Sequence, residues 1–498
     1  MSIKDEIENE IIDMIRKGAL ASGEKIPSIR KMSETHACSI TPVTDAYASL
    51  VSKHIIESKR GSGYVVSTQI SEYNDGFEAT APTSLFESEH YRMVDDFLKG
   101  YSQIAMNSSN DLSHPFGATS VYTRFFPEEE FRQIMVAAIR SGSSPGNYQA
   151  KTHDEMKLKR NLMRWMLPTE CTNTIDDLSI VRSTSEGVTL SILACLQPGM
   201  AVAIESPGHA GFYFSARFLN CKIIPAPSNP KTGLDVDAFE RILDAGAKIC
   251  CLVLCSTNSN PTGATMPDEN KARLCRLCAE YGVTIIEDDI SGELYFGEKR
   301  PRPLKSFDND NVIYVSGFGK CLQPVVRLGY VSAGRLKDRF AFFKHLNTAY
   351  AYPYLQDAVS DMIESGIAGN YVKVLRKQLK KFSTKYINLI QESFPEGTTI
   401  APSSGGPYLW VTLPDGLNAD TLGRRARMHG ISIAPGRLFY TPPGLSNITG
   451  KTAEIIDELV KDLDVNSSFR FNCLAVDYDD DAFKAVSELG KEACNMIK

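Results

Sequence analysis

The sequence predicts two folded units, a small α+β unit at the N-terminus and a larger α/β unit with a mainly parallel sheet. Two observations predict this arrangement. In the first 66 residues, apolar positions recur at helical spacing and then change to the pattern of a short hairpin. From about residue 111 onward, short apolar runs alternate with helical stretches and end in polar or glycine-rich residues, which is the pattern of α/β folds.

The composition indicates a globular protein. Hydrophobic residues make up 43% of the chain and charged residues 23%, a balance that supports a sizeable core and excludes disorder. No stretch approaches the apolar length of a membrane span, and the acidic N-terminus lacks the pattern of a signal peptide. We therefore expect a cytoplasmic protein without membrane contact.

The formal net charge of the chain is -6, so any DNA binding requires a local basic patch.

The cysteine spacing does not indicate a metal site. Of the 12 cysteines, Cys275 and Cys278 form a single C-x-x-C pair inside a helical pattern, and no second pair follows at zinc-site distance. We therefore expect structural thiols in a reducing compartment and no bound metal.

Residues 1–66 predict three helices followed by a hairpin. Apolar residues at helical spacing between positions 7 and 15 indicate the first helix. The second begins at Ser28, a favourable cap, and the third begins near Ser39 or Thr41. A tight, glycine-containing turn over residues 59–63 then joins two short apolar runs. This order is that of a winged helix-turn-helix, whose third helix enters the major groove of DNA.

The charge of this segment leaves two interpretations open. Residues 25–66 contain six Lys or Arg against three acidic residues, so a basic patch exists but is modest. Helix order and charge alone are also compatible with a small helical docking module.

The specific sequence favours DNA binding. The run GEKIPSIRKMSETHACSITPVTDAYASLVSKHIIESKRGSGYVV resembles the DNA-binding domain of the GntR superfamily. This resemblance implies DNA contacts from the second helix, the start of the third helix and the wing, at Arg30, Ser39, Thr41, Arg60, Gly61, Ser62 and Gly63. The sequence departs from the family at Ile40, where a basic residue is usual, and Asp45 lies on the same helix. Both departures predict weaker or more salt-dependent binding.

A polar segment follows this unit. We assign residues 1–70 to the DNA-binding domain, 71–110 to a linker and 111–498 to the large domain. The linker contains clusters of Ser, Asn and Thr, and apolar residues at near-helical spacing over 91–98 predict one helix within it.

Three strand ends in the large unit carry chemically informative residues. Asn260 follows the apolar run 252–254, Asp288 follows 283–286, and Lys320 follows 312–315. Ligand residues of α/β folds gather at strand ends. An amine for an imine, an acid for a ring nitrogen and an amide for a phenolic oxygen are the groups that a pyridoxal cofactor requires. Taken singly, Lys320 could be a surface lysine, Asp288 could cap a helix, and the segment that begins with Asn260 could be only a turn.

In this order and spacing they resemble fold-type-I aminotransferases over nearly all of residues 111–498, with a large and a small subdomain. The resemblance implies that Lys320 forms the imine with pyridoxal phosphate, that Asp288 pairs with the ring nitrogen, and that Asn260 bonds the phenolic oxygen. Arg327 would clamp the phosphate and Arg470 would bind the α-carboxylate of a substrate or effector. Further cofactor contacts are implied for Ser183, Thr184, His209 and Ser316.

The joining of the two domains resembles the MocR family of transcription regulators, and the runs EDDISGELYFGEKRPRPLKSFD, PSSGGPYLW and GISIAPGRLF strengthen this resemblance. It implies a homodimer that binds operator DNA and pyridoxal phosphate and responds to a small amine or amino-acid effector. One alternative is an active aminotransferase with an accessory DNA-binding domain. Another is a regulator that has lost the cofactor and keeps the large domain as a dimer scaffold.

Several positions depart from the aminotransferase pattern. Ser291 stands where a tyrosine usually supports the phenolic oxygen, Gly317 replaces a phosphate-binding serine, and Ser183 replaces a glycine. His153 lies where a glycine-containing loop is usual. We therefore expect cofactor binding without efficient transamination.

Overall fold

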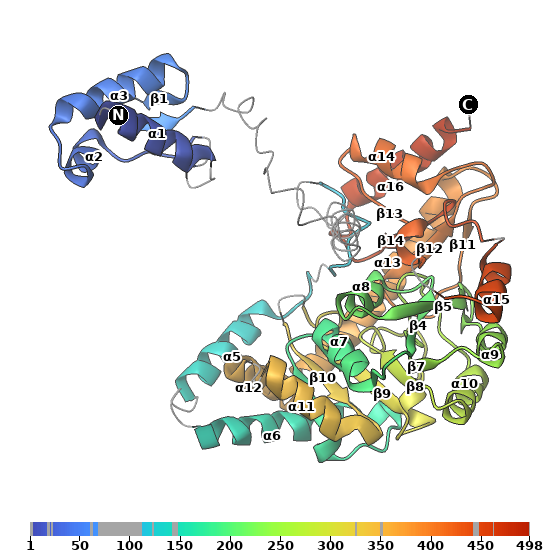
Figure 1. Cartoon of the computed structure of the whole chain (residues 1–498). Helices are drawn as coiled ribbons and strands as arrows, with labels where there is room; N and C mark the ends of the chain where they lie inside the picture. The colour runs from blue at the N-terminus through green and yellow to red at the C-terminus, as the bar shows by residue number, and fades with distance from the viewer. Residues whose placement is uncertain are drawn as a thin grey trace. The chain divides into compact units, whose positions relative to one another are not determined.

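A computed structural model of the chain divides into two compact units, residues 1–93 and 94–498 (Figure 1). The structure describes the residues in these ranges: 3–16, 20, 23–59, 63–67, 112–121, 124–141, 148–323, 326–348, 352–441, 448–461 and 463–497. The linker helix predicted over 91–98 and the wing residues Arg60, Gly61 and Ser62 lie outside these ranges. Each unit is described by itself.

The first unit contains the predicted three helices and hairpin. Its elements are α1 (Ile3–Arg16), α2 (Ile29–Thr35), α3 (Ile40–Ser52), β1 (Ile56–Lys59) and β2 (Gly63–Val66). The two strands pair antiparallel, with Ile56 opposite Val66. Apolar residues from all three helices and both strands form one core, because the helical spacing of residues such as Ile7, Ile11 and Val43 places them on one face.

Side-chain hydrogen bonds set the start of α2. Ser28 caps the helix, and its hydroxyl accepts a hydrogen bond from the amide of Lys31 at 3.3 Å. The hydroxyl of the buried Tyr47 in α3 donates to the carbonyl oxygen of Pro27 at 2.6 Å. The predicted cap is therefore confirmed, and Tyr47 ties the second helix to the third.

The large unit is built on an eight-stranded sheet, in the order β3-β10-β9-β8-β7-β4-β5-β6. Strands β4, β5, β7, β8 and β9 are parallel, while β10 runs antiparallel to both β3 and β9, so the prediction of a mainly parallel sheet is confirmed. The strands are β3 (Leu178–Val181), β4 (Ala201–Ser206), β5 (Lys222–Asn229), β6 (Gly233–Leu234), β7 (Ile249–Leu254), β8 (Thr284–Asp288), β9 (Val312–Gly317) and β10 (Gly329–Ser332).

Helices cover both faces of this sheet. One apolar cluster joins the sheet to α7 (Thr184–Cys195), α8 (Ala210–Phe218) and α11 (Lys337–Asn347). A second joins it to α9 (Val236–Asp244), α10 (Asp268–Glu280) and α15 (Lys451–Val460). Helices α5 (Glu128–Ser141), α6 (Tyr148–Trp165) and α12 (Pro353–Glu364) pack together, as Figure 1 shows. The result is a three-layer arrangement with the sheet in the middle.

The C-terminal part forms a smaller subdomain with its own four-stranded sheet, in the order β11-β12-β14-β13. Its elements, orange to red in Figure 1, are β11 (Thr399–Ile400), β12 (Tyr408–Thr412), β13 (Ala434–Pro435), β14 (Ser468–Asn472), α14 (Ala419–Arg427), α16 (Asp480–Asn495) and the long α13 (Ile367–Ser393). Residues 112–121 join this subdomain, because the amide of Asn472 donates to the carbonyl oxygen of Phe116 at 2.8 Å. The predicted division into large and small subdomains is confirmed.

Among the described residues, no helix combines the length and the apolar character that crossing a bilayer requires. Cys275 and Cys278 are both buried in α10, and burial raises the pKa of each thiol. Their burial supports the prediction that they are structural thiols.

Candidate functional site

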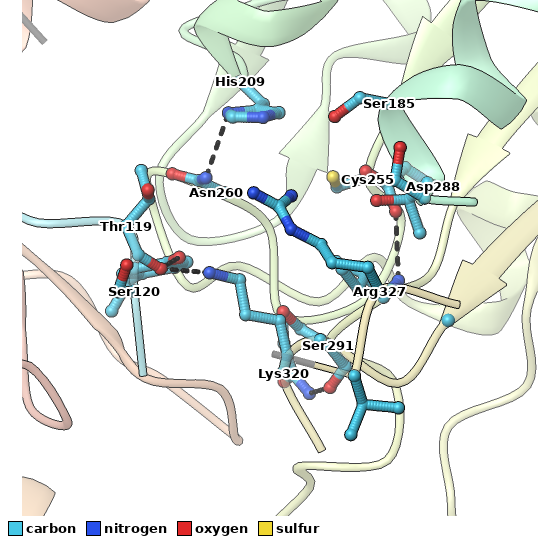
Figure 2. A pocket seen from close by; sticks show the side chains of 18 of the residues that line it. Thr119, Ser120, Ser185, His209, Cys255, Asn260, Asp288, Ser291, Lys320 and Arg327 are labelled. Carbon is cyan, nitrogen blue, oxygen red and sulfur yellow. Dashed lines mark hydrogen bonds between the residues drawn. The ribbon is translucent and has the colours of Figure 1, made fainter. Parts of the chain in front are cut away.

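The carboxyl ends of three neighbouring parallel strands meet at one cavity of about 230 Å³ (Figure 2). Asp288 is the last residue of β8, Asn260 lies in the loop after β7, and Lys320 follows β9. Because β8 lies between β7 and β9, three side chains from separate sequence motifs line the same space. Four further predicted residues line it as well, namely Ser183, Thr184, His209 and Arg327.

Asp288 presents a buried carboxyl group to this cavity. The residue is 5% exposed, and its Oδ1 accepts a hydrogen bond from the amide of Ile290 at 3.0 Å. Burial raises the pKa of Asp288 to about 7, and the negative charge of Asp289 adds to this effect. A cationic N–H donor in the cavity would stabilise the ionised form. The sequence placed Asp288 after its strand, whereas it is part of β8.

Lys320 extends across the cavity to the small subdomain. Its Nζ donates a hydrogen bond to the carbonyl oxygen of Thr119, which also accepts one from the hydroxyl of Tyr408 at 3.2 Å. The same Nζ lies 5.7 Å from the centre of the Tyr408 ring. The sequence motifs singled out neither Thr119 nor the role of Tyr408, although Tyr408 belongs to the run PSSGGPYLW.

One end of the cavity is suited to an anion. Ser183 caps α7, its hydroxyl accepting from the amide of Glu186 at 3.1 Å, so the first N–H groups of the helix face this end. Thr184 and Ser185 belong to the first turn of α7. Arg327 is exposed to the cavity, and no acceptor within the described ranges bonds its guanidinium.

The substitution of glycine for serine at position 317 has a steric reason. A Cβ atom on Gly317 would lie 2.8 Å from the carbonyl oxygen of Leu328 and 3.2 Å from Cγ2 of Thr184. Real Cβ atoms essentially never approach backbone oxygen so closely. A serine would therefore require the backbone of the cavity wall to move.

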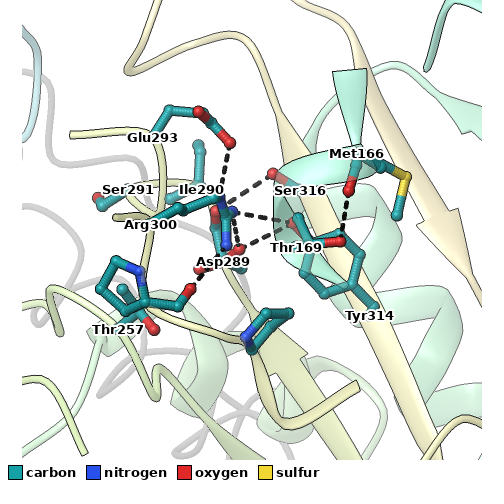
Figure 3. A network of polar contacts seen from close by, with 12 residues as sticks. Met166, Thr169, Thr257, Asp289, Ile290, Ser291, Glu293, Arg300, Tyr314 and Ser316 are labelled. Carbon is teal, nitrogen blue, oxygen red and sulfur yellow. Dashed lines mark hydrogen bonds and ion pairs between the residues drawn. The ribbon is translucent and has the colours of Figure 1, made fainter. Parts of the chain in front are cut away.

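Ser316 does not line the cavity, so its predicted cofactor contact is not supported. It lies within β9, and its buried hydroxyl donates to the carbonyl oxygen of Asp289 at 3.1 Å. Successive strand residues point to opposite faces, and it is Gly317 that forms the cavity wall. Ser316 instead belongs to a polar network behind Asp288 (Figure 3).

That network centres on a buried ion pair between Asp289 and Arg300, whose side chains are 0% and 1% exposed. Arg300 also donates through Nε to Glu293 at 2.7 Å, and the hydroxyl of Tyr314 donates to Oδ2 of Asp289 at 2.8 Å. Figure 3 shows these side chains converging on the turn after β8. The network thus fixes the backbone that carries Asp288 and Ser291.

Asn260 connects the cavity to Arg470. Its Nδ2 lies 3.1 Å from Nδ1 of His209, and its Oδ1 accepts a hydrogen bond from Nη1 of Arg470 at 2.9 Å. Burial lowers the pKa of His209 to about 3, and the charges of Arg470 and Lys320 add to the lowering. The His209 ring is therefore neutral, and its Nδ1 can accept the hydrogen bond from the amide.

Arg470 is a buried cation that forms no ion pair with any carboxylate of the described residues. The residue is 1% exposed, and its Nη2 donates to the carbonyl oxygen of Gly117 at 2.6 Å. Its guanidinium lies 4.7 Å from the ring centre of Tyr408 and 5.0 Å from that of Phe439. Within the part of the chain that the structure describes, Nε of Arg470 has no hydrogen-bond partner, and burial lowers the pKa of this guanidinium. Asp477, an acid that follows Arg470 in the sequence, lines a different cavity and forms no ion pair with it.

The first unit exposes the residues predicted to contact DNA. Arg30 is 87% exposed at the side chain and approaches Glu34 at 3.5 Å, while Ser39 and Thr41 are exposed at the start of α3. Ser39 is the N-cap position but makes no capping hydrogen bond with its side chain. Of the four wing residues, Gly63 is described. It begins β2 with a φ of +86°, which favours glycine.

Two family patterns match the chain. Residues 3–66 match the gntR family of bacterial regulatory proteins, and residues 124–463 match aminotransferase class I and II. The second match covers more than half of the chain. The chain belongs to the aminotransferase class I and II family. It joins this aminotransferase domain to a GntR DNA-binding domain, which is the architecture of MocR-type transcription regulators.

Full-length relatives share this architecture. The HTH-type transcriptional regulator YdcR of Escherichia coli is 28% identical over 88% of this chain and 92% of its own length. The HTH-type transcriptional regulator TauR of Rhodobacter capsulatus is 23% identical over 89% and 90%, respectively. These relatives favour a regulator over an aminotransferase with an accessory domain.

Solved structures support the fold of the aminotransferase domain. The kynurenine aminotransferase of Pyrococcus horikoshii matches 84% of this chain and 99% of its own chain with a TM-score of 0.68 and 22% identity. Membership of the aminotransferase class I and II family implies pyridoxal phosphate as the cofactor. The cavity fits this group, because it combines an amine, a buried carboxyl, an unpaired guanidinium and a helix N-terminus.

Proposed function

We propose that the chain is a transcription regulator whose aminotransferase domain holds pyridoxal phosphate and senses an amino acid. The observation that carries this proposal is Arg470, a buried guanidinium that has no carboxylate partner among the described residues. Burying such a charge is costly unless an anion compensates it, and the planar fork of arginine matches a carboxylate. The GntR domain supplies the DNA-binding half of the proposal.

The cavity residues have complementary roles in this proposal. Lys320 would hold the cofactor covalently, Asp288 would pair with the ring nitrogen, and His209 would lie against the ring. Asn260 would donate to the phenolic oxygen. When bound, pyridoxal phosphate supplies a carbon that reacts with primary amines, so a free amine can replace Lys320 there.

The phosphate would lie at the helix end of the cavity. Arg327 is exposed to the cavity, and Ser183 and Thr184 stand at the N-terminus of α7. The guanidinium would bind phosphate oxygens in pairs, while the helix end would donate N–H groups. The hydrogen-bond donors at this end suit an anion. No carboxylate of the described residues forms an ion pair with Arg327, so its guanidinium is available to the phosphate.

The DNA contacts would come from the first unit. We assign them to Arg30, to Ser39 and Thr41 at the start of α3, and to the wing residues Arg60, Gly61, Ser62 and Gly63. Ile40 is 57% exposed beside them and adds an apolar side chain where a charge would attract phosphate. Affinity therefore rests on Arg30 and the wing.

The assembly belongs to the same proposal. We assign residues 1–70 to the DNA-binding domain, 71–110 to a linker and 111–498 to the sensing domain, in a cytoplasmic homodimer that binds two DNA half-sites. A two-fold dimer would present two α3 helices to a palindromic operator.

Transamination is a weaker candidate function. Ser291 lines the cavity where a tyrosine is usual in aminotransferases, and its carbonyl oxygen is occupied by Nδ2 of Asn258 at 2.9 Å. Gly317 offers no hydroxyl to a phosphate. Production of a 2-oxo acid from the effector at rates typical of transaminases would favour the enzyme over the regulator.

The test measures whether an amino acid changes both the cofactor and DNA binding. Genome-wide mapping of bound DNA supplies the operator, and candidate amino acids are then titrated while cofactor absorbance and operator affinity are followed. Replacing Arg470 by Ala should raise the effector concentration needed about tenfold or more, while effector-free DNA binding persists. The exposed Arg424→Ala serves as the control. An unchanged effector concentration in Arg470→Ala would remove Arg470 as the carboxylate anchor.

A further inference from the structure

A second cavity of about 150 Å³ adjoins the first. His209 and Thr119 line both cavities, whereas Arg470 lines the second and not the first. A carboxylate that pairs with Arg470 would therefore lie in the second cavity, next to the two residues that line both cavities. The proposed effector site thus has two compartments.

The second compartment is apolar apart from these three residues. Its remaining walls are glycines and alanines, together with the side chains of Phe214, Leu438 and Phe439. Phe439 lies against the guanidinium of Arg470. The ring of Trp410 packs against the ring of Phe439, with 6.0 Å between the two ring centres. Phe439 is therefore held in place by the small subdomain, whereas Phe214 belongs to α8 of the large one.

Charge in this compartment is limited to one group. Arg470 is the single formally charged side chain among the described lining residues, because the lowered pKa of His209 keeps that ring neutral. The α-carboxylate of an amino acid would neutralise Arg470 and accept a hydrogen bond from its Nε, which has no partner among the described residues. No further charge then remains in the described wall to pair with a charged side chain.

The geometry points to an effector with an uncharged, apolar side chain, bound with its carboxylate on Arg470 and its side chain between Phe214, Leu438 and Phe439. This inference rests on the proposed function and narrows its effector class. An acidic side chain would lose its hydration without a second cation, and a basic one would also be repelled by Arg470. Apolar side chains gain from burial in the same space.

The close walls of the compartment depend on glycine. A Cβ atom on Gly211 would lie 2.7 Å from Nε2 of His209, and one on Gly117 would lie 2.6 Å from the carbonyl carbon of Ile433. A side chain at position 211 would displace the His209 ring, which lines both compartments, and one at position 117 would displace the backbone of Ile433. Glycine at positions 211 and 117 therefore leaves room for the His209 ring and for the Ile433 backbone, respectively.

The test compares amino acids that differ in charge at the end of the side chain. L-norleucine and L-lysine share the same carbon chain, and L-methionine and L-glutamate are of similar length. Each is titrated into the full chain carrying pyridoxal phosphate, and the half-saturation concentration is read from cofactor absorbance and from operator affinity. L-norleucine should act at a concentration about tenfold or more below that of L-lysine, and L-methionine likewise below L-glutamate.

A substitution in the compartment provides a second, independent test. Leu438→Glu introduces a carboxylate that can pair with an ammonium group, so the ratio of L-lysine to L-norleucine concentrations should fall about tenfold or more. Leu346→Glu, at a leucine that is 67% exposed on α11, is the matched control and should leave the ratio unchanged. Thermal unfolding of both variants verifies that they are folded. The comparison of the four amino acids on the unmodified chain does not depend on either variant.

The outcomes separate the two proposals. A response to L-lysine or L-glutamate at the same or lower concentration than to the apolar partner overturns this inference and leaves amino-acid sensing intact. A response to none of the four amino acids, in absorbance or in operator affinity, overturns the proposed sensing function and this inference with it.

Discussion

Asp289, the residue directly after Asp288, forms with Arg300 an ion pair that is almost wholly inaccessible to solvent. The pair lies against Gly292, since a Cβ atom there would come within 2.5 Å of Nη2 of Arg300 and would overlap the carboxylate of Asp289. Position 292 therefore has no room for a side chain while the pair is intact. The network behind the cavity and the cavity wall itself are parts of one packed unit.

We expect Gly292→Ala to destabilise the chain by about 3 kcal/mol, because separating a buried ion pair leaves uncompensated charges. Denaturant unfolding of the cofactor-free protein measures this change. Gly369→Ala is the matched control, since a Cβ atom at Gly369 in α13 meets nothing within 4 Å. Equal stability of the two variants would show that the turn adjusts without breaking the pair.

The pKa of Asp288 predicts a dependence of stability on pH. Its pKa is raised from 3.8 to about 7 in the folded chain, so proton binding favours folding. The stabilisation is complete below pH 3.8 and is lost as the pH rises through 7. Each pKa unit corresponds to about 1.4 kcal/mol.

Asp288→Asn should therefore stabilise the cofactor-free chain above pH 7 and reduce its loss of stability as the pH rises from 3.8 through about 7. The same variant should bind pyridoxal phosphate more weakly, since the ring nitrogen loses its anionic partner. Urea unfolding at several pH values and a cofactor titration measure the two effects. Asp415→Asn, at an exposed position, is the control. A lower stability of Asp288→Asn at pH 8 would contradict the prediction.

Lys320→Ala should abolish the adduct that borohydride reduction fixes between the chain and pyridoxal phosphate, because no other amine then lines the described cavity wall. Mass spectrometry of the reduced, digested protein locates the adduct. Lys337→Ala, at a half-exposed lysine paired with Asp177, should keep it. Persistence of the adduct in Lys320→Ala would assign the cofactor to another lysine.

Arg30→Ala should weaken DNA binding for every operator sequence and reduce the slope of log affinity against log salt by about one, because one phosphate contact is lost. Fluorescence anisotropy with a labelled duplex at several salt concentrations measures both quantities. Arg132→Ala is the matched control, since Arg132 forms a comparable exposed pair with Glu129 outside the DNA-binding unit. If both variants keep the parental slope, Arg30 does not contact a phosphate.

Much of the fold was predictable from local patterns. Helical periodicity, the Ser28 cap and the hairpin pattern identified the first unit, because each depends on residues a few positions apart. The strand runs and their polar ends likewise placed Asn260, Asp288 and Lys320 at neighbouring strand ends, since parallel strands align their carboxyl ends. Local register was less predictable, and it decided that Gly317 rather than Ser316 lines the cavity.

The sequence by itself determined the domain order, the α/β architecture and the residue types that suit pyridoxal phosphate. Only the tertiary structure decided which groups these residues meet. The carbonyl oxygen of Thr119 accepts a hydrogen bond from Lys320, which is 201 positions away in the sequence. Oδ1 of Asn260 accepts one from Arg470, which is 210 positions away. Arg470 also lies apart from Asp477, an acid that follows in the same segment, because β14 carries the Arg470 side chain into the second cavity. Such contacts depend on how two subdomains pack, which no short stretch of sequence encodes.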